Sequence, residues 1–390
     1  MHHSLKVNIV TAPQNAEQRS RRRLRRLGEA AAVVLMMGSC AGDRLIANAP
    51  NEPTNLLPGP SHIFSATSPS YAPTAPAPVA LQQEITRLGS SFNGAAGIAV
   101  RRVEGDWEAS YNANAPMPQQ SVSKLWVAMT LLDAVDRGKM TLNDPVTIRR
   151  QDLTLFHQPL ADMVRGEGYT TTLADLVTRA LTQSDNTAND SVLRRVGGPE
   201  AVRGFLARRF ISGIRFGPGE RVMQSMTAGL EWDQSLASGR AFYAARGRLP
   251  LSVREAALNT YLANPPDGAS ASAIAGALAR LKRGEMLSGP STAYLLETMH
   301  EAKTGPQRIK GGVPFDWSYA HKTGTGQILG ARSTGFNDVG VMTAPDGTSY
   351  AIAVMIGSTT VSIPARWALM QGVARAIVAN HQPRSAMAGY

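Results

Sequence analysis

Hydrophobic and polar positions alternate in two stretches near the ends of the chain, which is the period of half-buried β-strands. The first stretch, GIAVRRVEGDWEASYN over 97–112, predicts a hairpin that turns at 104–106. The second, GFNDVGVMTAPDGTSYAIAVMIG over 335–357, predicts a hairpin that turns at 345–347. Strands are therefore expected near both ends of the folded part of the chain.

Between these stretches, apolar residues recur at the three- and four-residue spacing of a helix. One helix is expected from Ser121 to Gly138, where glycine ends it. A second is expected from Thr172, a candidate N-cap with Asp175 three residues later, and it ends at Ser184. The apolar stripes of these two helices are Leu125, Ala128, Met129, Leu132 and Val135, and then Leu173, Leu176, Val177, Ala180 and Leu181.

The order of these elements predicts an α/β fold of the α+β kind. Strands that are distant in sequence must pair in one antiparallel sheet, and a last helix is expected over roughly 364–378. The middle helices then form a separate lobe or cover the sheet. A cleft between the sheet edge and a helical lobe is where we expect a site, within a folded region of 81–380.

The N-terminal residues carry much of the positive charge. The whole chain has a net charge of +11, and residues 1–40 hold seven basic residues against two glutamates. SRRRLRR at 20–26, followed by the short apolar run AAAVVLMMG at 30–38, predicts an export signal over 1–40. No aromatic or recognition pattern accompanies the basic run, so we expect no nucleic-acid partner.

Cys40 is the only cysteine, so it forms no intramolecular disulfide. It directly follows the apolar run, as MGSCAG, which is typical of a lipoprotein cleavage site; the alternative is a stray cysteine near an ordinary cleavage site. Residues 41–80 contain eight of the 24 prolines and predict a disordered tether. Residues 381–390 are expected to be a tail.

Ser121 and Lys124 stand one helical turn apart at the start of an apolar stretch. A serine hydroxyl becomes a good nucleophile only when a neighbouring base takes its proton. The neighbours Leu125, Trp126 and Val127 suggest apolar surroundings, in which desolvation disfavours the charged form of a lysine. The pair is therefore a candidate nucleophile and base, although Ser-x-x-Lys alone is a weak signal.

Two further motifs follow in order: Ser-Asp-Asn at 184–186, where a helix is expected to end, and Lys-Thr-Gly at 322–324, before the second hairpin. Class A β-lactamases and penicillin-binding proteins carry this three-part set. The flanking segments SDNTAN, GGPEAVRGFL, LKRGEMLS and TGPQRIKGGVPFDWSYAHKTGTG also match, so that 81–380 resembles the class A serine β-lactamase family. The resemblance implies an antiparallel five-stranded sheet flanked by helices, together with an all-helical lobe.

The resemblance also implies a role for each matching residue. Ser121 would attack the β-lactam carbonyl, and Lys124 would act in removing its proton. Ser184 would relay a proton to the leaving ring nitrogen, and Asn186 would bind the amide of the substrate's side chain. The backbone N–H groups of Ser121 and Thr325 would form the oxyanion hole.

The same resemblance places substrate-binding residues on the third motif. Lys322, with Thr323 and Thr325, would hold the substrate carboxylate. Gly324 would let the substrate backbone lie against the strand, where a side chain would block it. Arg332 is either a second cation for that carboxylate or a solvated arginine at a strand end.

Hydrolysis of the acyl-enzyme needs a glutamate that activates water, and two candidates are present. Glu220 matches the family's spacing, 36 residues after Ser184, and follows the Gly-Pro-rich loop RFGPGER. Glu255, with Leu258 and Asn259, matches the family's letters better but lies in a helix-like run opened by Pro250. Because a general base must first reach the water, we favour Glu220, where Gln224 replaces the usual Asn.

If Glu220 is the base, residues 225–260 are largely an insertion beside the site. Their aromatic residues Trp232, Phe242 and Tyr243 either wall the cleft or pack a small core of the insertion itself. His321, next to the Lys-Thr-Gly motif, is interpreted as structural. The seven histidines and one cysteine show no metal-ligand spacing, so we predict neither a metal nor a cofactor.

These observations predict an exported, periplasmic serine β-lactamase that acts on a small β-lactam or peptidoglycan-derived substrate as a monomer. The first alternative is a penicillin-binding D-alanyl-D-alanine carboxypeptidase or related serine hydrolase with slow deacylation. The second is a non-enzymatic β-lactam sensor that stays acylated. A sensor of that kind needs a transmembrane relay, and the sequence shows no span beyond the export signal.

Overall fold

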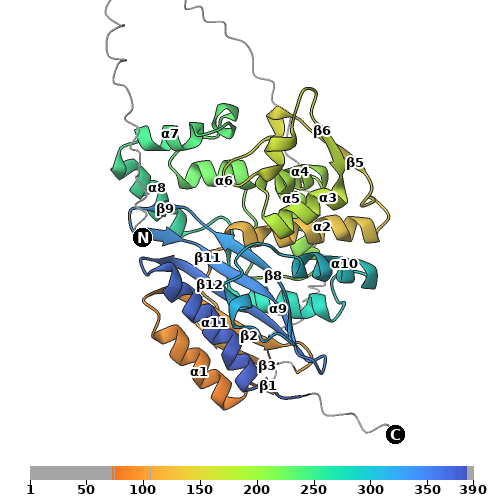
Figure 1. The fold of residues 1–390 in the computed structure, drawn as a ribbon, viewed down its shortest axis with the longest axis vertical. Helices are drawn as coiled ribbons and strands as arrows, with labels where there is room; N and C mark the ends of the chain where they lie inside the picture. The colour runs from red at the N-terminus through yellow and green to blue at the C-terminus, as the bar shows by residue number, and fades with distance from the viewer. Residues whose placement is uncertain (1–72, 74, 106, 384–390) are drawn as a thin grey trace, which may run out of the picture. The chain divides into compact units, whose positions relative to one another are not determined.

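The computed structural model describes residues 73, 75–105 and 107–383 (Figure 1). The predicted export signal, with Cys40, lies outside the described residues, as do most of the predicted tether and tail. The predicted boundary at residue 80 is too late, because strand β1 occupies Ala75–Pro76 and helix α1 begins at Val79.

Five long antiparallel strands form the sheet, as predicted from the family resemblance. Hydrogen-bonded neighbours follow the order β3, β2, β12, β11 and β8, so strands from both ends of the chain pair at the centre, with Val100 opposite Ile352. Short strands extend the sheet: β1 pairs in parallel with β3, and β10 joins β12 to β9. The bounds are Gly94–Arg102 (β2), Trp107–Tyr111 (β3), Ser318–Thr325 (β8), Ile328–Leu329 (β9), Arg332–Thr334 (β10), Phe336–Thr343 (β11) and Ser349–Thr359 (β12).

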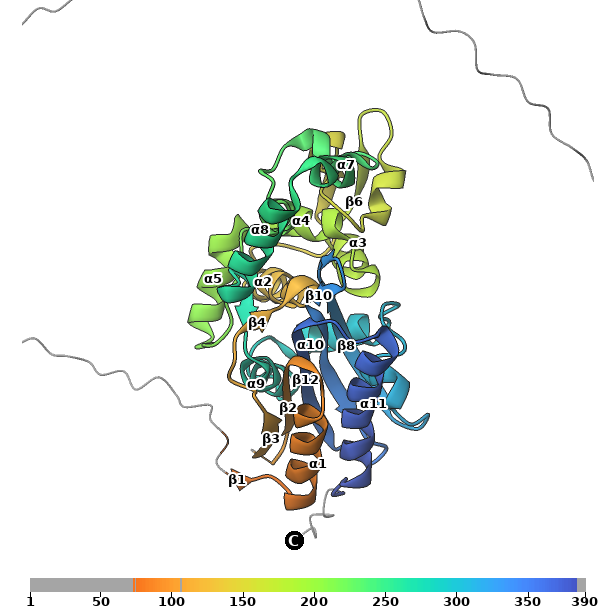
Figure 2. The ribbon, with the colours of Figure 1, turned by 90° about the vertical axis from the view of Figure 1, so that its left-hand side faces the viewer.

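Helices cover both faces of the sheet, which explains why the central strands are buried along nearly their whole length. Alternate residues of a strand point to opposite faces. Ile352 and Val354 therefore join a cluster with α1 and α11, whereas Ala351 and Ala353 join a second cluster with α9. Helices α1 and α11 lie side by side in both views (Figures 1 and 2). The bounds are Val79–Ser90 (α1), Ala271–Lys282 (α9), Gly289–His300 (α10) and Ile363–Ala379 (α11).

The middle of the chain forms the helical lobe around helix α2. Every residue from Lys124 to Ala134 on this helix is buried, because other helices and the sheet surround it. The prediction of an all-helical lobe is wrong in one respect: strands β5 and β6 form a short two-stranded antiparallel sheet there. The lobe's bounds are Lys124–Asp136 (α2), Pro145–Ile148 (β5), Tyr169–Thr172 (β6), Leu173–Thr178 (α3), Asn186–Arg195 (α4), Gly198–Arg208 (α5), Glu220–Thr227 (α6), Ala241–Arg248 (α7) and Leu251–Ala263 (α8).

The elements predicted from periodicity are confirmed. Both hairpins form, although Asp106 of the first turn lies outside the described residues. Helix α2 ends before Gly138, which has a φ of +67°. The Thr172 hydroxyl accepts the backbone N–H of Asp175, which caps α3 as predicted. None of the helices in the described part of the chain is long and apolar enough to span a bilayer.

Candidate active site

A cleft of about 530 Å³ lies between the end of strand β8 and the helical lobe. Its position agrees with the predicted cleft between a sheet edge and a helical lobe. The walls carry side chains from all three sequence motifs, and these lining residues include Ser121, Ser184, Asn186, Glu220, Thr323 and Thr325.

Ser121 lies on a 3₁₀ turn, Gln120–Ser123, that leads directly into α2. The preceding residue, Gln120, has a φ of +54°, a conformation that costs energy for a residue with a side chain. The carboxylate of Asp267 holds it there by accepting the Gln120 backbone N–H at 2.8 Å. Lys124, one turn after the serine, donates from Nζ to Ser121 Oγ at 2.7 Å.

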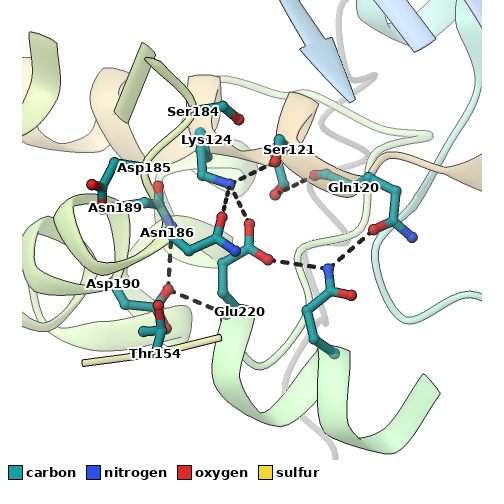
Figure 3. A network of polar contacts seen from close by, with 12 residues as sticks. Gln120, Ser121, Lys124, Thr154, Ser184, Asp185, Asn186, Asn189, Asp190 and Glu220 are labelled. Carbon is teal, nitrogen blue, oxygen red and sulfur yellow. Dashed lines mark hydrogen bonds and ion pairs between the residues drawn. The ribbon is translucent and has the colours of Figure 1, made fainter. Parts of the chain in front are cut away.

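The ammonium of Lys124 is buried, but its surroundings are polar, so the expectation of apolar surroundings is wrong. Besides Ser121 Oγ, Nζ donates to Asn186 Oδ1 at 2.8 Å and forms an ion pair with the Glu220 carboxylate (Figure 3). The neighbours Leu125 and Trp126 pack into the core instead. Helix geometry separates them, because consecutive residues on a helix point in different directions.

The structure brings Glu220, and not Glu255, into the cleft. Glu220 is the first residue of α6 and is 2% exposed, whereas Glu255 lies on an exposed face of α8 and is absent from the lining of the cleft. Gln224, one turn after Glu220, donates from Nε2 to Glu220 Oε2 at 3.2 Å and to Gln120 Oε1 at 3.0 Å. Glu220 therefore contacts the lysine directly and is linked through Gln224 to Gln120, the residue before the serine.

Asp190 is a second buried carboxylate behind Glu220, and the sequence analysis missed it. Its Oδ1 accepts the backbone N–H of Glu220 at 3.2 Å, and its Oδ2 accepts that of Arg221 at 3.4 Å (Figure 3). Burial raises the pKa of Asp190, and the charge of Glu220 raises it further. One signal was available: Asp190 lies one helical turn after Asn186, on the same face of α4.

Ser184, from the second motif, contacts the third motif. Its φ of +62° ends the preceding helical turn, and the next residue, Asp185, caps α4 by accepting the Ala188 backbone N–H at 2.8 Å. Lys322 donates from Nζ to Ser184 Oγ at 3.0 Å. Burial lowers the pKa of Lys322 well below its ordinary value, and the charge of Lys124 lowers it further.

The end of strand β8 presents hydroxyl groups to the cleft beside an arginine that the sequence analysis missed. Arg308 donates from Nη2 to Thr325 Oγ1 at 2.6 Å, and its guanidinium stacks 3.8 Å from the ring centroid of Phe336. Burial lowers the pKa of Arg308 to about 10. Arg332, the expected cation, instead donates to Asn259 and is not part of the cleft lining.

The packing of the protein itself requires glycine at position 324, in addition to the predicted need for space beside the substrate backbone. A Cβ at this position would lie 2.3 Å from the backbone oxygen of Gln119, two residues before Ser121. No real Cβ makes so short a contact with backbone, so glycine allows β8 to approach the segment that carries the serine. The constraint is internal to the protein.

His321 is buried beside Asp338, with Nδ1 2.8 Å from Asp338 Oδ1, which agrees with a structural role. Across 75–105 and 107–383, no group of three or more His, Cys, Asp or Glu side chains could hold a metal ion.

Of the three predicted wall residues, Tyr243 lines the cleft. Phe242 is buried with Leu155 in a small core, and Trp232 packs against that core. Both alternatives for these aromatic residues are therefore partly right.

The fold and the site together define a serine hydrolase with a Ser-x-x-Lys pair. A family model described as the β-lactamase enzyme family matches residues 80–381, so the chain belongs to this family. The chain is 26% identical over 316 residues to the extended-spectrum β-lactamase PER-1 of Pseudomonas aeruginosa, covering 81% of this chain and 91% of that protein. It is 28% identical to β-lactamase CTX-M-97 of Escherichia coli, covering 63% and 72% of the two chains.

Solved structures agree with this assignment. The crystal structure of a β-lactamase from Chitinophaga pinensis matches with a TM-score of 0.63 and 26% identity, covering 77% of this chain and 99% of that one. An ancestral class A β-lactamase matches with a TM-score of 0.60 and 27% identity, covering 77% and 99%. The predicted family and fold class are therefore confirmed.

Proposed function

We propose that this enzyme hydrolyses β-lactams through an acyl-enzyme on Ser121. The observation that carries the proposal is the position of Lys124, whose Nζ contacts Ser121 Oγ and the Glu220 carboxylate at once. A proton that leaves the serine hydroxyl thus has a short path to a base. The relatives PER-1 and CTX-M-97, both named β-lactamases, support the same reaction.

In the acylation step, Lys124 gives a proton to the Glu220 carboxylate with which it is paired. Its neutral amine then takes the proton of Ser121 Oγ while that oxygen attacks the lactam carbonyl carbon. The C–N bond of the ring then breaks, and Ser184 passes a proton to the ring nitrogen. Lys322 donates to Ser184 Oγ and can replace that proton. The backbone N–H groups of Ser121 and Thr325 would stabilise the negative charge on the carbonyl oxygen.

In the deacylation step, Glu220, ionised again by loss of its proton to solvent, takes a proton from a water molecule that attacks the carbonyl carbon of the Ser121 ester. The bond from that carbon to Ser121 Oγ breaks, Lys124 gives the serine oxygen its proton, and Glu220 returns a proton to Lys124. Gln224 contacts one oxygen of Glu220 and thereby fixes the orientation of the carboxylate. During both steps, Thr323, Thr325 and Lys322 would bind the substrate carboxylate. Arg308 adds positive charge there through its contact with Thr325.

Asn186 would bind the amide of the substrate's acyl side chain. Its Nδ2 already donates to Leu155 O at 2.9 Å and its Oδ1 accepts from Lys124. These two bonds fix the rotamer of the amide at the wall of the cleft. A substrate amide can bind there if one of these two hydrogen bonds rearranges, or if it accepts from the second N–H of the Asn186 side chain.

The lifetime of the acyl-enzyme tests the proposal and separates it from the peptidase and the sensor. After mixing with benzylpenicillin, mass spectrometry of the wild type should show an adduct on Ser121 that disappears rapidly. Glu220→Gln should keep the adduct, whereas Glu255→Gln, on the exposed face of α8, should behave like the wild type. A wild-type adduct that persists would favour the peptidase or the sensor, and no adduct would refute the proposal.

We also propose that the enzyme is exported to the periplasm, where β-lactams and their natural targets meet, and that it acts as a monomer. The cationic and apolar runs before Cys40 support export, and the position of Cys40 supports lipid attachment. Metabolic labelling with a palmitate analogue tests the anchor. Loss of the label in Cys40→Ser is the expected result, and an unlabelled wild type would contradict it.

A further inference from the structure

Helix α7 forms one wall of the cleft and presents two side chains that the proposed reaction does not use. Tyr243 and Arg246 line the cleft from this helix, together with Phe156 and Ile328 from other segments. Both helix residues belong to the predicted insertion, 225–260. The wall therefore combines an aromatic surface with a positive charge.

The charge of Arg246 has no acidic partner among the residues that the structure describes. Across 75–105 and 107–383, Arg246 forms no ion pair; Nη2 donates to the backbone oxygen of Ile328 at 2.9 Å, while Nε is buried without a hydrogen-bond partner. A guanidinium can donate five hydrogen bonds, so most of its capacity is unused. Burial lowers the pKa of Arg246, and the nearby charge of Arg254 lowers it further.

The aromatic part of the wall is held rigidly. The rings of Phe156 and Phe242 pack edge to face with centroids 4.7 Å apart, and Tyr243 packs edge to face against both, at 5.9 and 5.6 Å. Phe242 is 3% exposed, whereas Tyr243 is 53% exposed. The buried ring thus anchors an accessible one near the guanidinium, which provides a surface for a flat apolar group.

The rest of the cleft does not neutralise Arg246. Among the charged side chains that line it, Glu220 is paired with Lys124, and Arg308 is committed to Thr325 and backbone oxygens. His157, which also lines the cleft, adds no negative charge. The residues at the end of β8 would bind the one carboxylate that every such substrate carries, so Arg246 remains available for a second anionic group.

We propose that Arg246 is a specificity-determining residue that binds a carboxylate on the acyl substituent of the substrate, while Tyr243 contacts an aryl group on the same substituent. The proposal rests on the proposed β-lactamase function and names its substrate class. Arginine suits this task because its planar donors match the two oxygens of a carboxylate.

Carbenicillin and benzylpenicillin provide a matched pair of substrates, because they differ only by a carboxylate on the carbon next to the phenyl ring. The measured quantity is the ratio of kcat/KM for carbenicillin to that for benzylpenicillin. We expect Arg246→Gln to lower this ratio about tenfold, as expected for the loss of one charge-assisted hydrogen bond. Arg248→Gln is the control, because it removes the same charge from an exposed position on the same helix.

Salt provides a second measurement that does not depend on a variant's folding. Raising NaCl to about 0.5 M should lower the wild-type ratio, because the arginine is partly exposed and its attraction is screened. In Arg246→Gln the ratio should no longer respond. Equal losses for both penicillins, or a wild-type ratio insensitive to salt, would overturn the inference, whereas hydrolysis of neither penicillin by the wild type would instead refute the proposed function.

Discussion

The carboxyl of Asp267 offers a quantitative test, because burial raises its pKa to about 6 from the ordinary 3.8. Hydrogen bonds from the Gln120 backbone N–H and the Tyr261 hydroxyl oppose the shift without cancelling it. In the unfolded chain the group returns to its ordinary pKa. The folded protein therefore binds an extra proton between about pH 4 and pH 6.

The sign of the effect follows from this extra proton. Because the folded pKa is the higher one, the group's contribution to stability is fully present below pH 3.8 and is lost as the pH rises through about 6. The gap between the two pKa values corresponds to about 3 kcal/mol at 1.36 kcal/mol per pH unit. About 2 kcal/mol of this falls between pH 4.5 and 7.5, where the protein can be studied conveniently.

Urea unfolding of the wild type and of Asp267→Asn at several pH values measures the effect. Other groups titrate in both proteins, so the difference between their free energies of unfolding isolates Asp267. We expect the wild type to lose about 2 kcal/mol relative to the variant as the pH rises across this window. Tyr261→Phe should move the loss to higher pH, because it removes a hydrogen bond that lowers the pKa of Asp267.

Two results would refute this reasoning. A difference that stays constant between the two pH limits would mean that Asp267 does not titrate there in the folded protein. A wild type that gains stability relative to Asp267→Asn with rising pH would mean that its carboxylate is favoured by folding. In the first case the hydrogen bonds from Gln120 and Tyr261 would at least cancel the effect of burial on the pKa, and in the second they would outweigh it.

Three further predictions follow from buried contacts of the site. Asp190→Ala leaves two backbone N–H groups at the start of α6 unpaired, so we expect a loss of about 2 kcal/mol in urea unfolding and a longer-lived acyl-enzyme; unchanged values for both would contradict this. Gly324→Ala places a Cβ against Gln119 O and should lower the free energy of unfolding by about 1–3 kcal/mol, the cost of overpacking. A Tm equal to that of the wild type would show that the contact relaxes freely. Because burial lowers the pKa of Lys322, KM should rise at a lower pH than the ordinary pKa of a lysine would give, as this lysine loses its proton, and Lys322→Arg should move the rise to higher pH; identical pH profiles would exclude Lys322 as the titrating group.

The sequence predicted what depends on local periodicity. Ser121 and Lys124 were expected on one face because they are three residues apart on a helix, and the Lys124 contact with Ser121 Oγ at 2.7 Å agrees. The hairpin at 335–357 and the Thr172 cap followed from the same kind of short-range pattern. The order of the elements along the chain predicted the pairing of distant strands, and the order of the three motifs added the family.

Contacts between distant segments could not be predicted in this way. Lys124 meets Glu220 across 96 positions, and Gln120 meets Asp267 across 147. No local sequence pattern indicates such contacts. For this reason the surroundings of Lys124 were expected to be apolar, and Asp267 was not considered. Arg308 was missed for the same reason, since its neighbours in sequence do not reveal that it reaches Thr325.

The choice between Glu220 and Glu255 illustrates which kind of sequence signal carries physical information. The letters around Glu255 matched better, but its position in the middle of α8 leaves its orientation to the helix, which turns it to solvent. Glu220 begins a helix after a Gly-Pro-rich loop, and Asp190 holds the backbone at that point. A residue fixed at the start of a helix can point into a cleft whatever the sequence pattern of the rest of the helix. The spacing from Ser184 therefore indicated which glutamate lines the cleft better than the residues that follow the glutamate did.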